Sequence, residues 1–236
     1  MVKDVISAVR RELEQQVDEK TKGSYQNVFK EKVTYYGVKN SIVSKIAKTY
    51  FQEIKPLGKK DIFLLCEELL KSDYYEEAFI AFEWAYRLHK EYEPDDFVVF
   101  DNWLNKYINN WAKCDTLCNH TIGTFVEKYP QFIEKLKQWT ISENRWLRRA
   151  AAVTLIIPAK QGKFLKDILE ISDSLLTDQD DLVQKGYGWL LKDASIKHQA
   201  EVFGYIMRNK KIMPRTALRY AIERMPPELK RQAMRK

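Results

Sequence analysis

Residues 142–152 of the chain read Ser-Glu-Asn-Arg-Trp-Leu-Arg-Arg-Ala-Ala-Ala, and residues 180–188 read Asp-Asp-Leu-Val-Gln-Lys-Gly-Tyr-Gly. Each stretch begins with polar or acidic residues that can cap a helix, followed by an apolar residue, a base and a small residue. The bases Arg149 and Lys185 lie 36 positions apart, and residues 213–217, Met-Pro-Arg-Thr-Ala, form a weaker third copy around Arg215. The pattern predicts a helix that recurs with a period in the thirties to forties.

Helical periodicity extends over nearly the whole chain. Apolar residues recur every three or four positions, as at Val9, Leu13 and Val17, and no stretch alternates convincingly at period two. A repeat of this length and pattern is typical of stacked HEAT-like helix pairs. We therefore predict an all-α fold, an α-α superhelix (solenoid) with a concave basic groove, as a single domain over residues 1–236. A generic helical bundle is the alternative.

Composition excludes several classes of protein. The 236 residues include only 8 Gly, 7 Pro and 3 His, and we find no glycine-rich nucleotide-binding motif and no HExxH motif. No apolar run is long enough to span a membrane, and the first residues lack a signal-peptide core. The odd number of cysteines, 3, is typical of reduced thiols. We expect a soluble cytoplasmic protein with no cofactor.

Charge is distributed unevenly along the sequence. Residues 1–144 carry 21 basic and 23 acidic side chains, whereas residues 145–236 carry 19 basic and 10 acidic ones. A folded protein with one strongly basic half usually binds a polyanion, most commonly nucleic acid. A solvated basic tail is the alternative interpretation.

Trp111 and Asp115 are the first candidate site residues. They lie four positions apart after Asn109-Asn110, either of which can cap a helix, so both side chains should project from one helix face. The same face continues through Cys118 and Ile122 as an apolar stripe. An aspartate in line with such a stripe is costly unless it is paired, hydrated or used in chemistry. A satisfied structural polar group beside a core tryptophan is the alternative.

Trp189 lies off the buried stripe predicted for its helix. It is one turn from Lys185 and close to Lys192, a placement more typical of a ligand-facing side chain than of core packing. Gly186 and Gly188 flank it and each weakens a helix by roughly 0.5–1 kcal/mol relative to Ala. This cost suggests that another backbone, of protein or nucleic acid, comes close. Packing of Trp189 on a neighbouring repeat is the alternative.

Arg148 and Arg149 flank the core stripe of their own helix. Arginine makes forked contacts with phosphate oxygens that lysine cannot reproduce, so both are candidate DNA contacts, with solvated helix charges as the alternative. Cys114, Cys118 and His120 lack a fourth partner at ligand spacing, and we predict no metal site.

Four motifs occur together in the order Tyr35-Tyr36-Gly37-Val38-Lys39, Trp111-x-x-x-Asp115, Ser142-x-Asn144-x-Trp146-x-Arg148-Arg149-Ala150 and Lys185-Gly186-x-Gly188-Trp189-Leu190-Leu191-Lys192. This series resembles the AlkD-type DNA alkylation repair glycosylases, which are built from HEAT-like repeats. Lys192 stands where an arginine often follows Gly-Trp-Leu-Leu in that family, and Asn40-Ser41 replaces the usual Thr-Pro.

The resemblance implies hydrolysis of the N-glycosidic bond of N3- or N7-alkylated purines in duplex DNA. It implies that Asp115 is the catalytic aspartate and that Trp111 and Trp189 lie against the deoxyribose of the lesion. Arg149 matches an arginine near the phosphates of the lesion. Together with the charge pattern, the resemblance suggests that five basic residues contact phosphates: Arg148, Arg149, Lys185, Lys192 and Arg215.

Two other functions fit the same expected fold. One is a non-catalytic HEAT-repeat protein that recognises bent or branched DNA, and the other is a protein–protein scaffold. A pure binder needs no lone carboxylate facing the sugar, and a scaffold does not need the basic half. The leading expectation is a monomeric, metal-free DNA glycosylase that binds double-stranded DNA with alkylated purines, without a membrane, in the cytoplasm and on the nucleoid.

Overall fold

The computed structural model describes residues 2–29 and 31–235, without the side chains of residues 2, 3 and 26–28. Over this part of the chain the regular structure is helical, and β pairing is limited to an isolated bridge between Thr34 and Tyr74. The prediction of an all-α fold is confirmed. No helix of the described residues is both long enough and apolar enough to cross a membrane.

The chain divides into two compact units, Met1–Thr116 and Leu117–Lys236. Each unit has its own core, and each is described by itself. The single domain over residues 1–236 and the concave basic groove of a solenoid concern both units together, and they stay predictions.

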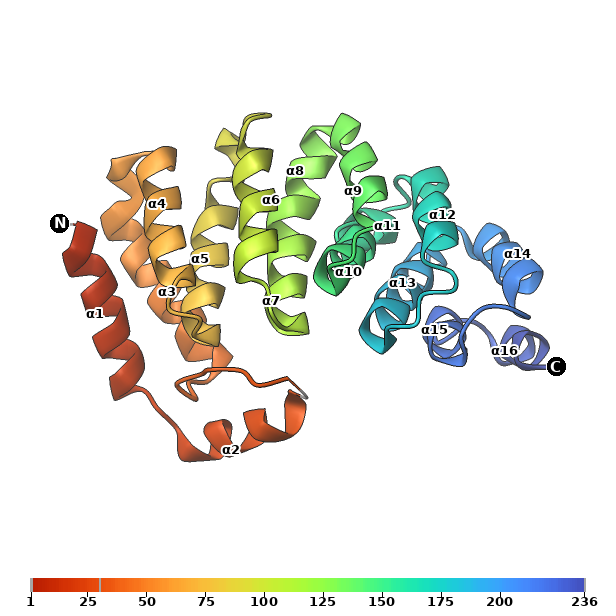
Figure 1. Cartoon of the computed structure of the whole chain (residues 1–236), viewed down its shortest axis with the longest axis horizontal. Helices are drawn as coiled ribbons and strands as arrows, with labels where there is room; N and C mark the ends of the chain where they lie inside the picture. The colour runs from red at the N-terminus through yellow and green to blue at the C-terminus, as the bar shows by residue number, and fades with distance from the viewer. Residues whose placement is uncertain (1, 30, 236) are drawn as a thin grey trace. The chain divides into compact units, whose positions relative to one another are not determined.

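Unit 1 is built from consecutive helices that pack side by side. Helix α5 lies at its centre, against α3 and α4, and also packs on α7 (Figure 1). The helices of unit 1 are α1 (Val2–Gln15), α2 (Glu19–Val28), α3 (Asn40–Ile54), α4 (Lys59–Leu70), α5 (Tyr75–Arg87), α6 (Asp96–Tyr107) and α7 (Trp111–Thr116), with short 3₁₀ turns at Lys55–Leu57 and His89–Glu91.

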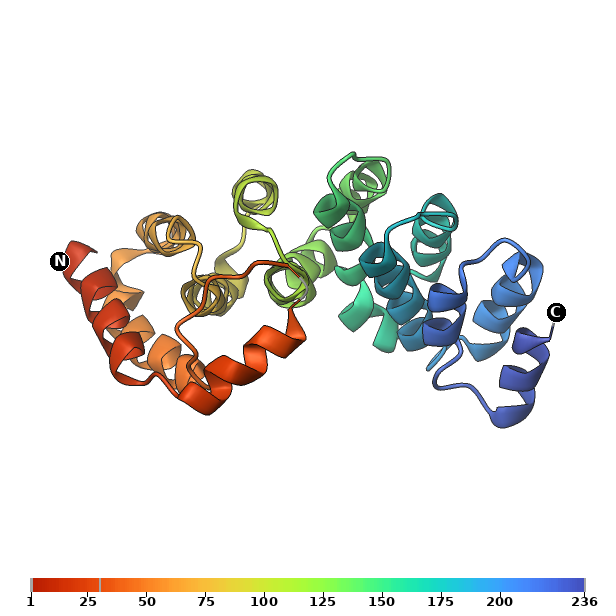
Figure 2. The same ribbon diagram turned by 60° about the horizontal axis from the view of Figure 1, so that its bottom comes forward.

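Unit 2 continues with shorter helices. They are α8 (Gly123–Lys128), α9 (Ile133–Trp139), α10 (Arg145–Val153), α11 (Ile156–Lys160), α12 (Leu165–Ser174), α13 (Asp181–Ala194), α14 (Gln199–Asn209), α15 (Arg215–Ala221) and α16 (Pro227–Met234), preceded by a π-helical segment at Leu117–Ile122 and with a 3₁₀ turn at Pro130–Phe132. Helix α13 packs between α10 and α15 (Figures 1 and 2). The three copies of the sequence repeat therefore become three helices in contact in a row.

The helix starts of unit 2 follow the sequence signals. Asn144 accepts a hydrogen bond from the backbone N–H of Trp146 at 2.9 Å, and Asp180 accepts one from that of Leu182 at 2.9 Å. These caps satisfy backbone donors that the first turn leaves without partners. Arg145 also forms an ion pair with the capping Asp180 at 2.8 Å, which ties the starts of α10 and α13 together.

The stretch after Trp111 differs from the expected single helix. Helix α7 ends at Thr116, and Leu117–Ile122 is wound as a π-helix before α8 begins at Gly123. A π turn inserts an extra residue per turn, so positions beyond it no longer share a face at α-helical spacing. Cys118 and Ile122 are buried, as expected of an apolar stripe, but they do not continue the α-helical face of Asp115.

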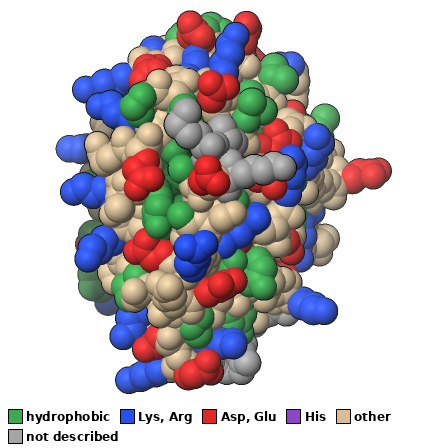
Figure 3. Space-filling model, turned by 90° about the vertical axis from the view of Figure 1, so that its left-hand side faces the viewer, with side chains coloured by type: hydrophobic (Ala, Val, Ile, Leu, Met, Phe, Trp, Pro, Cys, Tyr) green, Lys and Arg blue, Asp and Glu red, His purple; other side chains and the backbone are tan. Residues whose placement is uncertain are grey.

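The face beside α1 carries charges of both signs. Lys and Arg side chains alternate with Asp and Glu there, with small hydrophobic areas between them (Figure 3). This mixture agrees with the balance of 21 basic and 23 acidic residues over positions 1–144.

Candidate functional site

Trp111 and Asp115 occupy successive turns of α7, at the end of unit 1. Asn110 caps this helix, because its side-chain oxygen accepts from the backbone N–H of Lys113 at 3.0 Å. Both candidate side chains are half-buried, so each keeps a solvent-accessible portion. The predicted cap and the four-residue spacing therefore place an indole and a carboxylate on one face of a short helix.

An aromatic cluster supports Trp111 within unit 1. The ring of Phe29 lies 5.7 Å from that of Trp111, and the ring of Tyr75 lies 5.8 Å from that of Phe29. Tyr25 completes the cluster, with its ring 5.7 Å from Tyr75 and 5.3 Å from Tyr35 in edge-on geometry. Contacts of this kind stabilise ring orientation by roughly 0.5–1.5 kcal/mol per pair. Trp111 thus contacts Phe29 directly, and Phe29 in turn packs against the other rings of the cluster.

Lys113 anchors α7 from its buried side. Its side chain is 2 % exposed, and its ammonium group lies 2.6 Å from Oδ1 of Asp73 and 3.0 Å from the carbonyl oxygen of Asp73. Asp73 adopts a left-handed backbone conformation, with φ of 63°, in the turn before α5. A buried ammonium needs such a partner, so this pair fixes the position of α7 on α5.

Glu76 organises the Tyr36-Gly37-Val38 segment of the sequence motif. Its carboxylate is fully buried and accepts the backbone N–H groups of Gly37 at 2.8 Å, Tyr36 at 3.0 Å and Val38 at 3.1 Å. Gly37 has φ of +94°, a conformation that favours glycine. The motif is therefore a loop wrapped around a buried carboxylate. The neighbouring Glu77 accepts the Tyr36 hydroxyl at 2.7 Å, and burial together with this bond raises the pKa of Tyr36.

Trp189 lies on α13 in unit 2, off the buried stripe as predicted. Val183, Tyr187, Leu190, Leu191 and Ala194 form that stripe and are all buried, whereas Trp189 is half-buried. Its indole Nε1–H donates to Oδ2 of Asp193 at 2.8 Å, one helical turn further on. The indole is therefore fixed in one orientation by a hydrogen bond to an anion.

Asp193 is fully buried and is compensated by two cations. Arg224 lies 3.0 Å from its Oδ1, and Lys160 lies 3.4 Å from its Oδ2. An anion buried to this degree needs paired charges, and these two come from α11 and from the turn after α15. Sequence reasoning missed Asp193. The one available signal was its position four residues after Trp189 in a helix.

The glycines beside Trp189 have different neighbours. A Cβ atom at Gly188 would lie 2.7 Å from Cβ of Tyr220 and 2.8 Å from the carbonyl oxygen of Ala217, both on α15. At Gly186 it would meet the Arg149 side chain at ordinary contact distances of 3.5 Å and 3.6 Å. The backbone that approaches Gly188 is thus that of a neighbouring protein helix.

The five candidate bases all lie in unit 2 but differ in exposure. Arg149 is 5 % exposed, and its Nη1 donates to the carbonyl oxygen of Leu182 in the first turn of α13. Arg148 pairs with Asp178 at 2.6 Å, and its Nη1 donates to the carbonyl oxygens of Ser142 and Glu143. Both arginines are therefore engaged in holding α10 against its surroundings.

The remaining three bases lie on α13 and α15. Lys185 pairs with Asp181 at 2.7 Å and its side chain is 30 % exposed. Lys192 is 12 % exposed and lies 3.1 Å from Glu223, with its ammonium 5.8 Å from the centre of the Tyr220 ring. Arg215 is exposed at the first position of α15. The contacts between α13 and α15 bring this group of bases onto adjoining helices.

The cysteines fit a structural role. Cys66, Cys114 and Cys118 are buried, and none of them is part of a disulfide among the described residues. Across residues 2–29 and 31–235, no group of three His, Cys, Asp or Glu side chains is arranged to hold a metal ion.

Comparison with known proteins identifies the class. Residues 9–225 match the family described as DNA alkylation repair enzyme. The match covers most of the chain, so the chain belongs to the DNA alkylation repair enzyme family. This membership establishes an enzyme with a role in the repair of alkylated DNA and makes DNA its partner.

A solved structure shares the fold. It is described as a predicted DNA alkylation repair enzyme from Enterococcus faecalis, and it superposes with a TM-score of 0.80 over 90 % of this chain and 98 % of its own. The two sequences are 16 % identical, so the likeness extends to the fold alone. No protein with curated annotation matches the chain.

Proposed function

We propose that this protein is a DNA glycosylase that hydrolyses the N-glycosidic bond of N3- or N7-alkylated purines in duplex DNA. The observation that carries the proposal is the pairing of Trp111 and Asp115 on one short, capped helix of a DNA alkylation repair enzyme. Both side chains are half-buried, and the aromatic cluster of unit 1 holds the indole in place.

The chemistry starts from a positively charged base. Alkylation at N3 or N7 makes the purine cationic, so it departs with the bonding electron pair as a neutral molecule and needs no protein acid. The sugar then develops oxocarbenium character at C1′. The carboxylate of Asp115 stabilises this cation and orients the water that attacks C1′, and the proton of that water passes to the carboxylate. Electrostatic stabilisation of this kind contributes about 3–4 kcal/mol.

The two tryptophans are assigned to the same developing charge. An indole face attracts a cation by about 0.5–2 kcal/mol, depending on how far the cation is removed from water. Trp111 takes this role from α7, and Trp189 takes it from α13. The hydrogen bond from Trp189 to Asp193 supports the assignment, because an indole with a fixed orientation loses little entropy when substrate binds.

The bases are assigned to the phosphodiester backbone. Lys185, Lys192 and Arg215 contact phosphates directly and set the register of the duplex without reading its sequence. Arg148 and Arg149 add positive charge close to the start of α13, and their contacts with Asp178 and Leu182 hold α10 in place. The enzyme works as a monomer without metal or cofactor, in the cytoplasm and on the nucleoid.

The test is release of free bases from methylated duplex DNA, measured by chromatography of 3-methyladenine and 7-methylguanine. We expect the wild-type protein to release them and Asp115→Asn to release none, while DNA affinity stays within about twofold. Asp61→Asn is the matched control, because Asp61 is an exposed aspartate of the same unit on α4. Equal release by Asp115→Asn and wild type would reject the catalytic assignment.

The same experiment separates the glycosylase from a non-catalytic DNA-binding protein. A pure binder would hold methylated duplex DNA tightly and release no base, and the aspartate substitution would change nothing. A protein–protein scaffold would release no base either. It would bind DNA only weakly and through few phosphates, so its affinity would depend little on salt.

A further inference from the structure

Helix α7 carries two of the proposed catalytic side chains but is too short to fix its own orientation. It has 6 residues, Trp111–Thr116, whereas isolated helices shorter than about 12–15 residues are marginal in water. The orientation of α7 must therefore come from contacts outside the helix. It packs on α5, and polar groups of its first turn converge on Asp73, in the turn before α5.

Hydrogen bonds reach Asp73 from both sides of the start of α7. The Lys113 ammonium group donates to Oδ1 of Asp73 at 2.6 Å and to its carbonyl oxygen at 3.0 Å, and the Asn109 amide donates to the same Oδ1 at 2.8 Å. Asn110 closes the network, because its amide donates to Oδ1 of Asn109 at 3.1 Å and its own Oδ1 accepts the backbone N–H of Lys113 at 3.0 Å. These residues thus form a closed ring of hydrogen bonds around the helix start.

The turn that carries Asp73 is itself held on both sides. Asp73 has φ of 63°, a left-handed conformation that a short polar side chain tolerates better than most. Its backbone N–H donates to the carbonyl oxygen of Leu70 at 3.3 Å, and the N–H of Tyr75 donates to that of Thr34 at 2.9 Å. Asp73 therefore presents its carboxylate to α7 from a fixed corner between α4 and α5.

Lys113 holds α7 from the side opposite to the two candidate side chains. Successive residues of an α-helix lie about 100° apart around its axis, so Lys113 is about 160° from both Trp111 and Asp115. Its side chain is 2 % exposed, whereas that of Asp73 is half-exposed. The ion pair therefore acts on the buried back of α7 and leaves the face with the indole and the carboxylate unobstructed.

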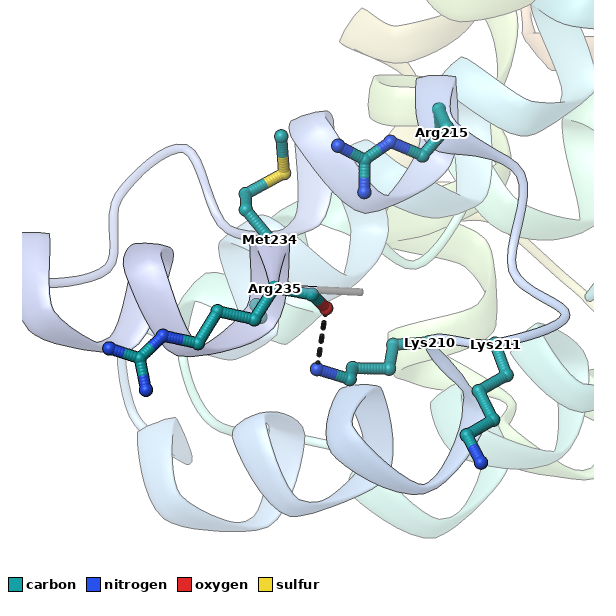
Figure 4. A pocket seen from close by; sticks show the side chains of 6 residues that line it. Lys210, Lys211, Arg215, Met234 and Arg235 are labelled. Carbon is teal, nitrogen blue, oxygen red and sulfur yellow. Dashed lines mark hydrogen bonds between the residues drawn. The ribbon is translucent and has the colours of Figure 1, made fainter.

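A surface lysine at another helix end shows the contrast. The ammonium group of Lys210 donates to the backbone carbonyl oxygens of Arg235 at 2.8 Å and Gln232 at 3.1 Å, at the end of α16 (Figure 4). That contact is exposed, so water can take its place. Burial denies Lys113 this exchange, and stability alone does not explain a buried ion pair, because apolar replacements are often neutral or stabilising. A role in fixing geometry does explain it.

We propose that Asp73 and Lys113 are positioning residues of this enzyme. Their ion pair sets the rotation of α7 about its axis, and through it the direction of the Asp115 carboxylate. The proposal rests on the catalytic role proposed above for Asp115. A side-chain group lies about 5–6 Å from the axis of its helix, so a rotation of about 10° displaces it by about 1 Å. A misplacement of that size can cost about 100-fold in rate.

The variant Lys113→Met separates geometry from stability. It removes the buried ammonium and leaves the half-exposed Asp73 carboxylate to water, so no buried charge is left without a partner and the fold should persist. The measured quantity is the single-turnover rate of 3-methyladenine and 7-methylguanine release from methylated duplex DNA, with protein in excess. We expect this rate to fall about 10- to 100-fold, while the dissociation constant of the duplex stays unchanged.

Lys59→Met is the matched control in the same unit. Lys59 is 12 % exposed and lies 2.9 Å from Asp96 and 2.8 Å from Glu93, at the start of α6, and these partners are not part of α7. Its loss leaves the buried Asp96 carboxylate without this cation and should destabilise the fold more than Lys113→Met does. Base release per folded protein should nevertheless equal that of wild type. Equal losses of release in both variants would mean that activity follows stability, and would overturn the positioning role.

Asp73→Asn tests the other partner, and it serves as well if Lys113→Met folds poorly. Asparagine tolerates the left-handed conformation and can still accept from Asn109, so the turn should persist while the charge is lost. Because both substitutions break the same pair, the double variant should release bases no more slowly than Lys113→Met alone. A double variant whose loss equals the product of the two single losses would contradict the proposal.

A readout without catalysis distinguishes this proposal from the proposed function. Fluorine NMR of protein labelled with fluorotryptophan reports on each indole, and Trp111→Phe identifies the resonance of Trp111. We expect Lys113→Met to shift or broaden this resonance and Lys59→Met to leave it unchanged. If wild type releases no base but the resonance still responds, the positioning of α7 stands and the glycosylase assignment fails. If wild type releases bases and Lys113→Met neither moves the resonance nor slows release, the positioning role is wrong.

Discussion

A methyl group added at Gly188 tests whether the close packing of α13 on α15 contributes to the stability of unit 2. In Gly188→Ala the new Cβ would lie 2.7 Å from Cβ of Tyr220 and 2.8 Å from the carbonyl oxygen of Ala217. Neither neighbour is the flexible end of a side chain, so α15 has to move away. Gly186→Ala is the matched control on the same helix, because its Cβ would meet Arg149 and Val153 at distances of at least 3.5 Å.

The expected magnitudes follow from two opposing effects. Replacing a mid-helix glycine by alanine stabilises a helix by about 0.5–1 kcal/mol. Overpacking a tight contact costs about 1–3 kcal/mol, and backbone neighbours place Gly188 in the upper part of that range. Gly188→Ala should therefore lower the free energy of unfolding by about 1–2 kcal/mol, while Gly186→Ala should raise it by about 0.5–1 kcal/mol. The two variants should differ by roughly 1.5–3 kcal/mol, although both replace a glycine by alanine in the same helix.

Urea unfolding followed by circular dichroism measures this difference. Each variant is compared with wild type at equal m-value, so that a shift of the midpoint reports stability. A second readout is DNA affinity, because Lys185 and Trp189 lie on α13, and Gly188→Ala should weaken binding more than Gly186→Ala. If Gly188→Ala is as stable as Gly186→Ala, the close contact with α15 does not exist in solution and the packing argument is refuted.

Three further predictions concern polar groups that are buried, at Asp193 and Glu76, or half-buried, at Tyr36. Asp193→Asn keeps an oxygen that can accept the hydrogen bond from the indole of Trp189, whereas Asp193→Leu does not. The rate of base release should therefore fall in Asp193→Leu and largely persist in Asp193→Asn. Equal rates in the two variants would show that Asp193 does not act through Trp189. Glu76→Gln places an amide NH₂ against a backbone N–H and should cost about 2–3 kcal/mol in urea unfolding, with the exposed Glu68→Gln as a silent control. Because burial raises the pKa of Tyr36, the unfolded chain releases the phenol proton near pH 10, before the folded chain does. The free energy of unfolding should therefore fall above pH 10, and it should fall less in Tyr36→Phe. Urea midpoints of both proteins at pH 8 and pH 11 measure the difference.

Much of the local structure could be predicted from the residues. The caps Asn144 and Asp180, the buried stripe of α13 and the position of Trp189 outside it follow from periodicity and capping chemistry, and the structure confirms them. These features depend on neighbours within about four positions, so a sequence pattern carries them. The roles of Asp115, Trp111 and Trp189 came from motif resemblance, and they remain proposals.

The π-helical conformation of Leu117–Ile122, which follows α7, could not be predicted in the same way. Apolar spacing indicated one continuous face from Trp111 through Cys118, whereas Leu117–Ile122 is a π-helix. The choice between α and π winding depends on how the segment packs against its surroundings, and a hydrophobic pattern of a few residues does not encode it.

The amino-acid order by itself determined that this chain is helical, where several helices begin, which faces are buried and which half carries the positive charge. Tertiary structure alone decided which polar groups meet: Glu76 with the loop at Gly37, Asp193 with Arg224 and Lys160, and Lys210 with the end of α16. The physical reason is the separation along the sequence between the groups that interact. Periodicity reports contacts one turn away, whereas a buried charge is satisfied by partners that lie some 20 to 40 positions distant and become neighbours only when helices pack.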